Sequence, residues 1–414
     1  MGPDEPARGP GVLRHINRRV VLESLRAAPG LATVAMVMER TGLSRPAVTR
    51  ALSDLGEVGL VEWLEARGTG VGRPAQHVRF NAEIGHVAGV GIDPRHIQVV
   101  LTDLAGTPVA ATGVVAPSSG TEIVQAAADA IDHCLSSAGV DGTRLWAVTA
   151  GTPGIIDTDG AIRVAPSIPN WAGLPVNSVL RRRFRCPVFI DNDVTLAALA
   201  EHSLGAASGN DTFAYVHWGE RVGTGVMIDG RPYRGSSSAA GELGFLDVAG
   251  DPDRPSGDDA RDLTARDGLG GFERLVGTRA IRELALAEAA PGSALHARAR
   301  AADLGHISRV LFELAAEGDA VAQALCERVT RRFATGLAAL LLLLDPEVVV
   351  IGGDVAASGP PLIDLLNRHL AARLLVEPRL VLSELGENAV ARGAAVHARS
   401  AVKDRIHEMT TDSS

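Results

Sequence analysis

The chain of 414 residues is poor in cysteine, aromatic residues and lysine, and it has no long hydrophobic run. Its three cysteines, Cys134, Cys186 and Cys326, are far apart, which excludes a disulfide framework and a CxxC metal motif. The longest apolar run, residues 337–344, is much shorter than the roughly 18–20 residues that span a bilayer, and no apolar signal segment follows Met1. We therefore expect a cytoplasmic protein without membrane contact.

Aromatic residues make up only 3% of the chain and hydrophobic residues 46%, so alanine, valine and leucine must form the core. The length suits two or three domains of roughly 150 residues each. Residues 1–82 carry 11 arginines and 8 acidic residues (net +3), and the remainder carries 29 basic and 41 acidic residues (net −12), which together give −9. A basic N-terminal part favours contact with DNA phosphates, and the acidic remainder disfavours wrapping of DNA around the whole protein.

Residues 41–50 have the pattern of a turn that leads into a DNA-recognition helix. Gly42 gives the turn its backbone freedom, and Ser44 is placed to cap the helix that follows. Apolar residues recur at helical spacing over 48–55, so one face of this helix should be buried. The residues expected to contact DNA from the other faces are Ser44, Arg45, Thr49 and Arg50.

A predicted β-hairpin follows, with strands near residues 58–63 and 77–80. Between them, Gly72 and Pro74 would hold the backbone extended while Arg73 projects, which suits the narrow minor groove of A·T-rich DNA. The alternative is an ordinary exposed hairpin turn. With the helix pair, this pattern predicts a winged helix-turn-helix DNA-binding domain over residues 13–82, after a disordered segment at 1–12.

The sequence after Asn81 predicts two lobes that open with the same order of strands. Buried strands at 87–93, 97–101 and 109–115 precede a helix, and a similar series begins at residue 213. A repeated opening of this kind indicates duplication around a cleft. We expect lobe one at about 83–190 plus a C-terminal helix, lobe two at about 191–385, an end of this two-lobed domain near residue 400, and a tail at 401–414.

Six motifs occur in an order that is typical of one family. They are Gly72-Arg73-Pro74, Gly151-Thr152-Pro153-Gly154, Pro169-Asn170-Trp171, Asn192-Asp193, Gly241-Glu242-Leu243-Gly244 and Ile351-Gly352-Gly353. On these motifs the chain resembles the transcriptional regulators of the ROK family (repressor, open reading frame, kinase), over about residues 15–399. The resemblance implies an α/β fold in which a winged helix-turn-helix precedes a two-lobed, actin- and hexokinase-like (ribonuclease H-like) ROK domain.

The resemblance also implies a ligand site between the lobes. Asn192 and Asp193 would reach the hydroxyls of a sugar, and Asp193 would stand at the catalytic base of the family's kinases, where a carboxylate accepts the proton of the attacking hydroxyl. Glu242 and Glu273 would bind further hydroxyls, and Asn170 would line the same pocket. The alternative for Asp193 is a helix N-cap, which is compatible with binding and weighs against catalysis.

Two departures from the family pattern concern catalysis and metal binding. Asp93-Pro94-Arg95-His96-Ile97 stands where the kinases have an Asp-x-Gly-Gly-Thr loop around ATP phosphates, and proline and bulky side chains would block that approach. Gly223-Thr224-Gly225 is expected to persist as a second phosphate loop. Phe245 replaces a zinc-binding histidine, and no cysteine lies between Cys186 and Cys326, so we expect no bound metal.

We therefore expect a repressor, a homodimer or dimer of dimers, that binds operator DNA and a sugar or sugar derivative and that has no cofactor and no enzymatic activity. Two alternatives remain open. The first is an active ATP-dependent sugar kinase with an appended DNA-binding domain. The altered loop at Asp93 argues against this kinase activity. The second is a regulator with a decayed pocket that responds to a protein partner, which Phe245 keeps open because it replaces an expected sugar contact.

Overall fold

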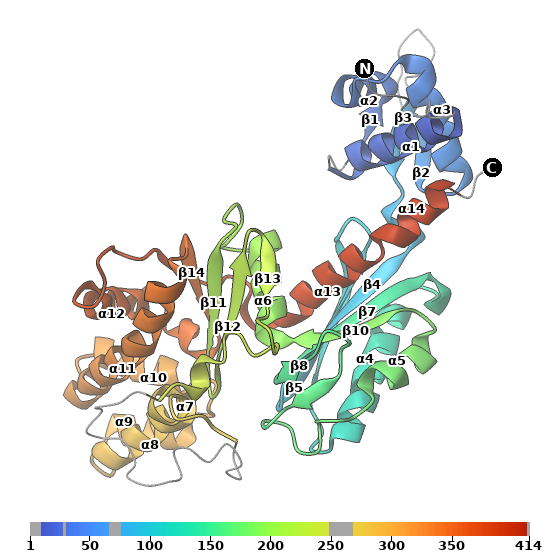
Figure 1. Ribbon diagram of the computed structural model, residues 1–414. Coiled ribbons are helices and arrows are strands. Elements are labelled where there is room, and N and C mark those ends of the chain that lie inside the picture. The colour runs from blue at the N-terminus through green and yellow to red at the C-terminus, as the bar shows by residue number, and fades with distance from the viewer. Residues whose placement is uncertain (1–9, 28–29, 66–75, 248–267, 412–414) are drawn as a thin grey trace.

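The computed structural model describes residues 10–27, 30–65, 76–247 and 268–411. A small N-terminal domain, coloured blue in Figure 1, stands apart from two larger lobes, and the last two helices run from between the lobes towards it. Within the described residues, none of the helices combines the length and the apolar character needed to cross a membrane.

The N-terminal domain is a winged helix-turn-helix, as the sequence predicts. Its elements are α1 (Pro10–Ala27), β1 (Ala32–Thr33), α2 (Val34–Thr41), α3 (Arg45–Glu57), β2 (Val61–Glu65) and β3 (Gln76–Phe80). The strands form an antiparallel sheet in the order β1-β3-β2. Gly42 ends α2 with a φ of 69°, and its amide donates to the Met38 carbonyl, so the turn between the two helices requires the left-handed freedom of glycine.

Lobe one is built on a five-stranded sheet. Its strands are β4 (His86–Ile92), β5 (His96–Asp103), β6 (Pro108–Val115), β7 (Leu145–Thr152) and β10 (Val188–Asn192), in the order β10-β7-β4-β5-β6. The first three strands are antiparallel, and β7 and β10 join in parallel. Helices α4 (Gly120–Ser137) and α5 (Val176–Phe184) share an apolar core with this sheet, and β8 (Ile155–Ile156) pairs with β9 (Ile162–Val164) at its side.

Lobe two repeats the same sheet order, which confirms the predicted duplication. Its strands are β11 (Phe213–Trp218), β12 (Val222–Ile228), β13 (Arg231–Tyr233), β14 (Val348–Gly352) and β15 (Leu380–Leu382), in the order β13-β12-β11-β14-β15. The helices that cover it are α7 (Glu273–Val276), α8 (Thr278–Glu288), α9 (Ala294–Ala301), α10 (Ile307–Ala316), α11 (Ala320–Leu344) and α12 (Pro360–Ala371). In its core the ring of Trp218 stacks on Phe333, with 3.5 Å between ring centroids.

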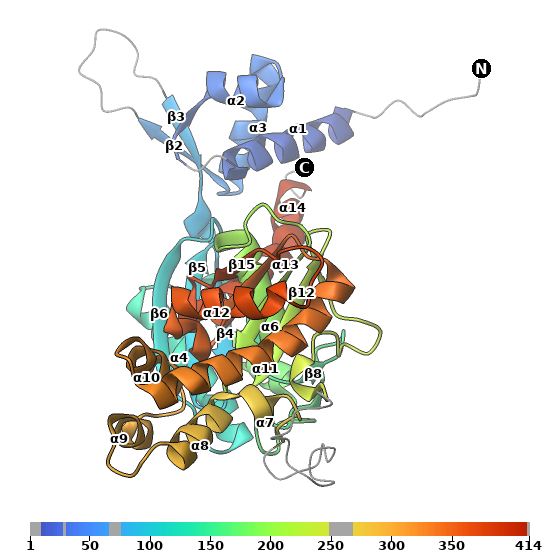
Figure 2. The same cartoon turned by 90° about the vertical axis from the view of Figure 1, so that its left-hand side faces the viewer.

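Two helices connect the three parts of the molecule. α13 (Ala389–Ala401) packs on α6 (Asp193–Leu204) and on strands β4 and β7 of lobe one. This packing is close, because a Cβ on Gly393 would lie only 1.8 Å from the Leu196 carbonyl oxygen. The sequence predicts a tail at 401–414, and the structure places α14 (Lys403–Thr411) within it, packed against α1 (Figure 2).

Candidate functional site

The recognition helix α3 presents its predicted DNA-contacting residues to solvent. The opposite face is buried in the domain core, as the helical spacing predicts, through Val48, Ala51, Leu52 and Leu55. The outward side chains are all exposed: Ser44, Arg45, Thr49 and Arg50. The helix can therefore enter a major groove without loss of its own packing.

Ser44 occupies the N-cap position of α3, but its side chain forms no capping hydrogen bond. The prediction that the Ser44 hydroxyl caps this helix is therefore wrong. A physical reason lies in the first turn, because Pro46 has no amide hydrogen to donate to the capping oxygen. The exposed hydroxyl and the remaining first-turn amides form a surface that suits a backbone phosphate.

An ion cluster that the sequence analysis missed fixes α3 against α1. Both oxygens of the Asp54 carboxylate accept hydrogen bonds from Arg14, at 2.7 Å from Nε and 2.6 Å from Nη2, and Arg18 Nε lies 3.8 Å away. The hydrogen bond from Arg14 is the main cause that lowers the pKa of Asp54. The available signal was an acidic residue between Leu52 and Leu55, on a helix face that is otherwise apolar.

Of the wing, the structure describes only the two strands β2 and β3. β2 and β3 pair with Val61 opposite Phe80 and Glu65 opposite Gln76. Arg73, expected to enter the minor groove, lies outside the described residues together with the rest of 66–75. Its contact with DNA stays a prediction.

Between the lobes, Asn192 and Asp193 stand at the start of α6. Asn192 is the N-cap: its Oδ1 accepts from the Thr195 amide at 3.0 Å, and its Nδ2 donates to the Gly154 carbonyl at 3.0 Å. The capping role considered for Asp193 therefore belongs to its neighbour. Asp193 Oδ1 accepts a hydrogen bond of 2.8 Å from the Val194 amide, which leaves further acceptor positions for a ligand.

Asp193 and Glu242 are half-buried carboxyl groups with perturbed acidity. Burial raises the pKa of Asp193, and the nearby charge of His217 opposes this shift. Burial, followed by the charges of Asp193 and Glu273, raises the pKa of Glu242 to about 7. The three predicted acids therefore share one electrostatic environment, which His217 of β11 also joins. Sequence reasoning missed His217, although it is a polar residue in an otherwise apolar strand.

Glu273 is only 4% exposed, and its carboxylate already accepts hydrogen bonds from the backbone. Oε1 accepts from the Val222 amide at 2.9 Å, and Oε2 accepts from the Gly270 amide at 2.7 Å and lies 3.5 Å from Arg221 Nη1. A Cβ on Gly244 would come within 2.6 Å of Oε1, which explains the glycine two residues after Glu242. These contacts order the segments around Glu242 and leave Glu273 less capacity for a ligand than the sequence suggested.

Asn170 lies on an exposed loop of lobe one and has a left-handed φ of 56°. The loop is anchored by the buried Trp171, whose Nε1 donates to Thr152 Oγ1 at 2.8 Å. Of the five predicted ligand-binding residues, the structure brings together the three acids, with Asn192 next to Asp193. The part that Asn170 plays in the site stays a prediction.

The loop between β4 and β5 is occupied by side chains of the protein itself. Asp93 Oδ1 accepts from the amides of Arg95 and His96, at 2.6 and 3.0 Å, so these two amides are not available to a phosphate. The Arg95 guanidinium reaches lobe two and pairs with Asp354 at 3.2 Å. Burial alone would lower the pKa of Arg95, but the charges of Asp354, Asp93 and Glu220 outweigh burial and raise this pKa.

The predicted second phosphate loop is a strand. Gly223-Thr224-Gly225 lies within β12, where these residues pair with His217, Val216 and Tyr215 of β11. The sequence itself indicates a strand from Thr224 to Asp229 with Gly223 before it, and the structure confirms that strand. A role of these glycines in phosphate binding stays a prediction. The turn that joins β11 to β12 contains Glu220, which pairs with Arg279 and repels phosphate.

A second ion pair joins the lobes near Asn192. Asp191 of β10 binds Arg234, which follows β13 of lobe two. Phe189 of the same strand contacts the ring of His397 on α13, edge to face, and His397 Nδ1 lies 3.0 Å from Thr149 Oγ1. These contacts place the start of α6 next to the helix that continues towards the N-terminal domain.

In the described part of the chain, no three His, Cys, Asp or Glu side chains are grouped so that they could hold a metal ion. Phe245 lies in a short 3-10 helix, Leu243–Phe245, and most of the segment that replaces the zinc-binding cluster falls in residues 248–267, outside the described residues.

Family models match both parts of the chain. A model of the ROK family matches residues 87–401, and a model of the IclR helix-turn-helix domain matches residues 20–65. A xylose repressor of Bacillus subtilis (strain 168) is 26% identical over 406 residues, which cover 96% of this chain and 98% of that protein.

Solved structures share the fold. A ROK hexokinase from Thermus thermophilus is 33% identical, with a TM-score of 0.61 over 77% of this chain and 99% of its own. A ROK family transcriptional regulator, a homolog of the MLC protein of E. coli, is 20% identical, with a TM-score of 0.74 over 97% of this chain and 99% of its own. The second structure has the fold of nearly the whole chain, including the N-terminal domain.

Proposed function

Because the chain belongs to the ROK family and carries a helix-turn-helix domain ahead of its ROK domain, we propose that it is a repressor whose DNA affinity is controlled by a sugar or sugar derivative. The exposed face of α3, with Arg45, Thr49 and Arg50 outward, is the observation that carries DNA binding. Similarity to a xylose repressor over 96% of the chain supports repression in response to a sugar. A helix-turn-helix protein that binds as a symmetric dimer contacts two half-sites, so we propose that a dimer binds a roughly palindromic operator.

We propose that the ligand binds between the lobes, through Asn170, Asn192, Asp193, Glu242 and Glu273. Asp193 and Glu242 are the strongest members of this set because each is half-buried and has acceptor capacity left for a hydroxyl. Asn192 and Glu273 support the site by their bonds to the backbone. Acidic groups of this kind favour a neutral polyol and disfavour an anion.

α13 and α14 provide the connection from this site to the DNA-binding domain. α6 begins at Asp193 and packs along α13, and α14 continues from α13 to α1. A ligand that prefers one arrangement of the lobes would shift α6 against α13 and thereby displace α1. In a dimer, this displacement would change the distance between the two recognition helices and so the fit to two half-sites.

We further propose that the chain does not phosphorylate sugars. Phosphoryl transfer depends on groups that position and stabilise the phosphates. Here the amides after Asp93 bond to its own carboxylate, Arg95 is held by Asp354, and Glu220 adds negative charge. Sugar-dependent ATP turnover that is lost in Asp193→Ala would contradict this proposal.

Fluorescence anisotropy with a duplex from the chain's own upstream region tests DNA binding. We expect Arg50→Ala to weaken binding by roughly 5- to 150-fold, the effect of about 1–3 kcal/mol for one base contact. Arg182→Ala, an exposed arginine on α5, is the matched control. Absence of salt-dependent binding by the wild-type protein would refute the proposal.

The same assay, repeated with a panel of pentoses and hexoses, tests the ligand site. We expect one sugar to lower DNA affinity in the wild-type protein, and Asp193→Ala and Glu242→Ala to bind DNA normally but lose this response. A response that survives in both variants would place the sugar elsewhere. A protein that binds DNA but responds to no sugar would favour control by a protein partner.

A further inference from the structure

The carboxylate of Asp191, at the end of β10, lies where three parts of the molecule meet. Its Oδ1 accepts a hydrogen bond of 2.9 Å from the amide of Asn192, the next residue in the chain and part of the proposed ligand site. Arg234 of lobe two binds the same carboxylate with two nitrogens, since Nε lies 3.4 Å from Oδ1 and Nη2 donates to Oδ2. Asp191 is only 7% exposed, so water screens its charge poorly and the pairing with Arg234 matters more than it would at the surface.

His397 of α13 packs on the side of β10 that carries Asp191. Phe189 and Asp191 are two residues apart on this strand, so their side chains point to the same face of the sheet. The ring of His397 contacts Phe189 edge to face, with 5.4 Å between ring centroids. Its Nδ1 lies 3.0 Å from Oγ1 of Thr149, which pairs with Phe189 in the sheet. The third part of the molecule at this carboxylate is therefore α13.

Asp191 and Arg234 have opposite effects on His397. Burial lowers the pKa of His397, the charge of Asp191 raises this pKa, and the charge of Arg234 lowers it. Without Arg234 nearby, Asp191 would therefore favour the protonated imidazole. The elements packed on α13 also direct uncharged or already bonded groups towards it: Gly89 and Gly91 of β4, Thr149 of β7, Phe189 of β10, Asp103 of β5, which accepts from the amides of Ala105 and Thr107, and Glu201 of α6, which binds Ser383 and the Ala206 amide.

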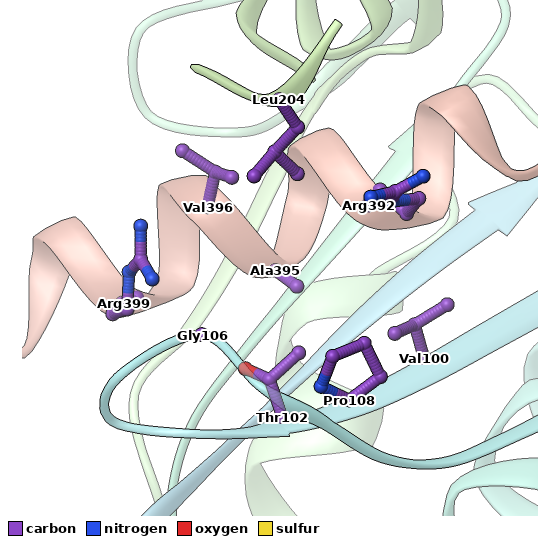
Figure 3. Close-up of a pocket in the computed structure, with 9 residues that line it drawn as sticks. All are labelled: Val100, Thr102, Gly106, Pro108, Leu204, Arg392, Ala395, Val396 and Arg399. Carbon is purple, nitrogen blue, oxygen red and sulfur yellow. The ribbon is translucent and has the colours of Figure 1, made fainter. Parts of the chain in front are cut away.

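α13 extends from His397 to the DNA-binding domain. Two residues later, Arg399 lies beside the turn at Gly106 (Figure 3), where its Nη1 donates to the Ala105 carbonyl at 2.6 Å. Burial, and then the charge of Arg399, lowers the pKa of Arg26 near the end of α1. The end of α13 is thus close enough to α1 for the two arginines to repel each other, and a shift of α13 changes this contact between the domains.

We propose that Asp191 couples the arrangement of the lobes to the DNA-binding domain, with Arg234 as the contact that lobe movement breaks and His397 as the group on α13 that responds. When Arg234 withdraws, His397 takes up a proton from solvent and is drawn towards Asp191 and away from Thr149, and α13 shifts with it. This inference rests on the proposed function and specifies how the ligand site regulates DNA binding. Asp191 is a positioning residue in this scheme, because it acts on DNA through α13.

NMR titration of isotope-labelled histidine in the full chain, without DNA or ligand, tests the coupling directly, and His397→Gln identifies the signal. We expect Arg234→Gln to raise the pKa of His397 and Asp191→Asn to lower it, because the first change removes a positive charge and the second a negative one. A general loosening of the fold does not give shifts of opposite sign. Arg234→Lys should restore the wild-type titration, and Arg231→Gln, an exposed arginine of β13, is the matched control. Absence of a shift in both variants, or shifts of the same sign, overturns the proposal.

Fluorescence anisotropy with the duplex from the chain's own upstream region tests whether the coupling reaches the DNA-binding domain. At pH 6, below the ordinary histidine pKa of 6.5, Arg234→Gln should weaken DNA binding by roughly fivefold or more, the lower end of measured couplings between sites, and by less at pH 8. Asp191→Asn added to Arg234→Gln should restore wild-type affinity, because no charge remains to draw His397.

Wild-type affinity of Arg234→Gln at pH 6 overturns the coupling to DNA. A loss of affinity that Asp191→Asn does not restore overturns the role of Asp191, since the ion pair would then only hold the lobes together. A wild-type protein that binds no duplex refutes the proposed repressor function instead, and the histidine titration, which needs no DNA, still decides whether Asp191 links Arg234 to His397.

Discussion

The raised pKa of Glu242 makes the stability of the protein depend on pH in a way that one substitution should remove. The folded state holds the proton of Glu242 more tightly than the unfolded state, so stability falls as pH rises from 4.5 to about 7 and is constant above that. Glu242→Gln replaces the carboxyl group by a neutral amide of the same shape. The variant should therefore lack this part of the pH dependence.

The magnitude follows from the two pKa values. The difference between 4.5 in the unfolded chain and about 7 in the folded chain corresponds to about 3 kcal/mol. This figure is an upper value, because the half-buried Glu242 keeps some contact with water. At pH 5.5 the ionisation of Glu242 destabilises the folded state by only about 1 kcal/mol, and at pH 8 it does so by the full amount. The stability of Glu242→Gln relative to wild type should thus increase by up to about 2 kcal/mol between these pH values.

Urea denaturation of both proteins at pH 5.5 and pH 8 measures this change. Any constant effect of the amide cancels in the comparison between pH values, which isolates the titration of the carboxyl group. Glu377→Gln, an exposed carboxylate between α12 and β15, is the matched control. If the stability difference between wild type and Glu242→Gln is the same at both pH values, Glu242 ionises as an ordinary glutamate and the electrostatic account of the interlobe acids is wrong.

Three further substitutions test the packing that supports the two sites. Asp54→Asn should destabilise the N-terminal domain by about 3–5 kcal/mol, because it leaves the buried Arg18 without a compensating charge. Wild type should lose this stability in acid, as the pH falls through the lowered pKa of Asp54, and the variant should not show that loss. Urea denaturation from pH 7 to pH 3 measures both effects. Phe333→Ala should cost about 3–5 kcal/mol in the same assay, because it empties the stack against Trp218. Trp171→Phe should cost about 1–3 kcal/mol through loss of its bond to Thr152, and sugar affinity measured alongside shows whether the Asn170 loop matters to the ligand.

Local patterns in the sequence were sufficient for the helix-turn-helix and for the repeated strands. The left-handed glycine at 42 and the apolar spacing over 48–55 are properties of short segments, and the structure confirms both. The family resemblance is confirmed as well, since the ROK model covers residues 87–401. Local reasoning was wrong at Ser44, where the proline two residues later removes a donor from the first turn of the helix.

The contacts that define the interlobe region could not be predicted from sequence spacing. Arg95 and Asp354 are 259 residues apart, and Asp191 and Arg234 are 43 residues apart, so each pair depends on how the complete lobes meet. The hydrogen bonds from backbone amides to Glu273 cannot be predicted from a sequence motif either, because a motif specifies only residue types. The three acids Asp193, Glu242 and Glu273 do lie together, but only the structure shows that backbone amides already bind Glu273.

The N-terminal domain leaves the ribosome before α14, the helix that completes its apolar core. Val21 and Leu52 belong to the same apolar cluster as Trp146 of β7 and Ile406 of α14. At a synthesis rate of about 5–20 residues per second, roughly 15–65 s separate the emergence of residue 82 from that of residue 406. During this interval α1 can pack against α2 and α3 but not yet against α14. The order of translation therefore leaves part of the apolar surface of this domain uncovered until α14 has emerged.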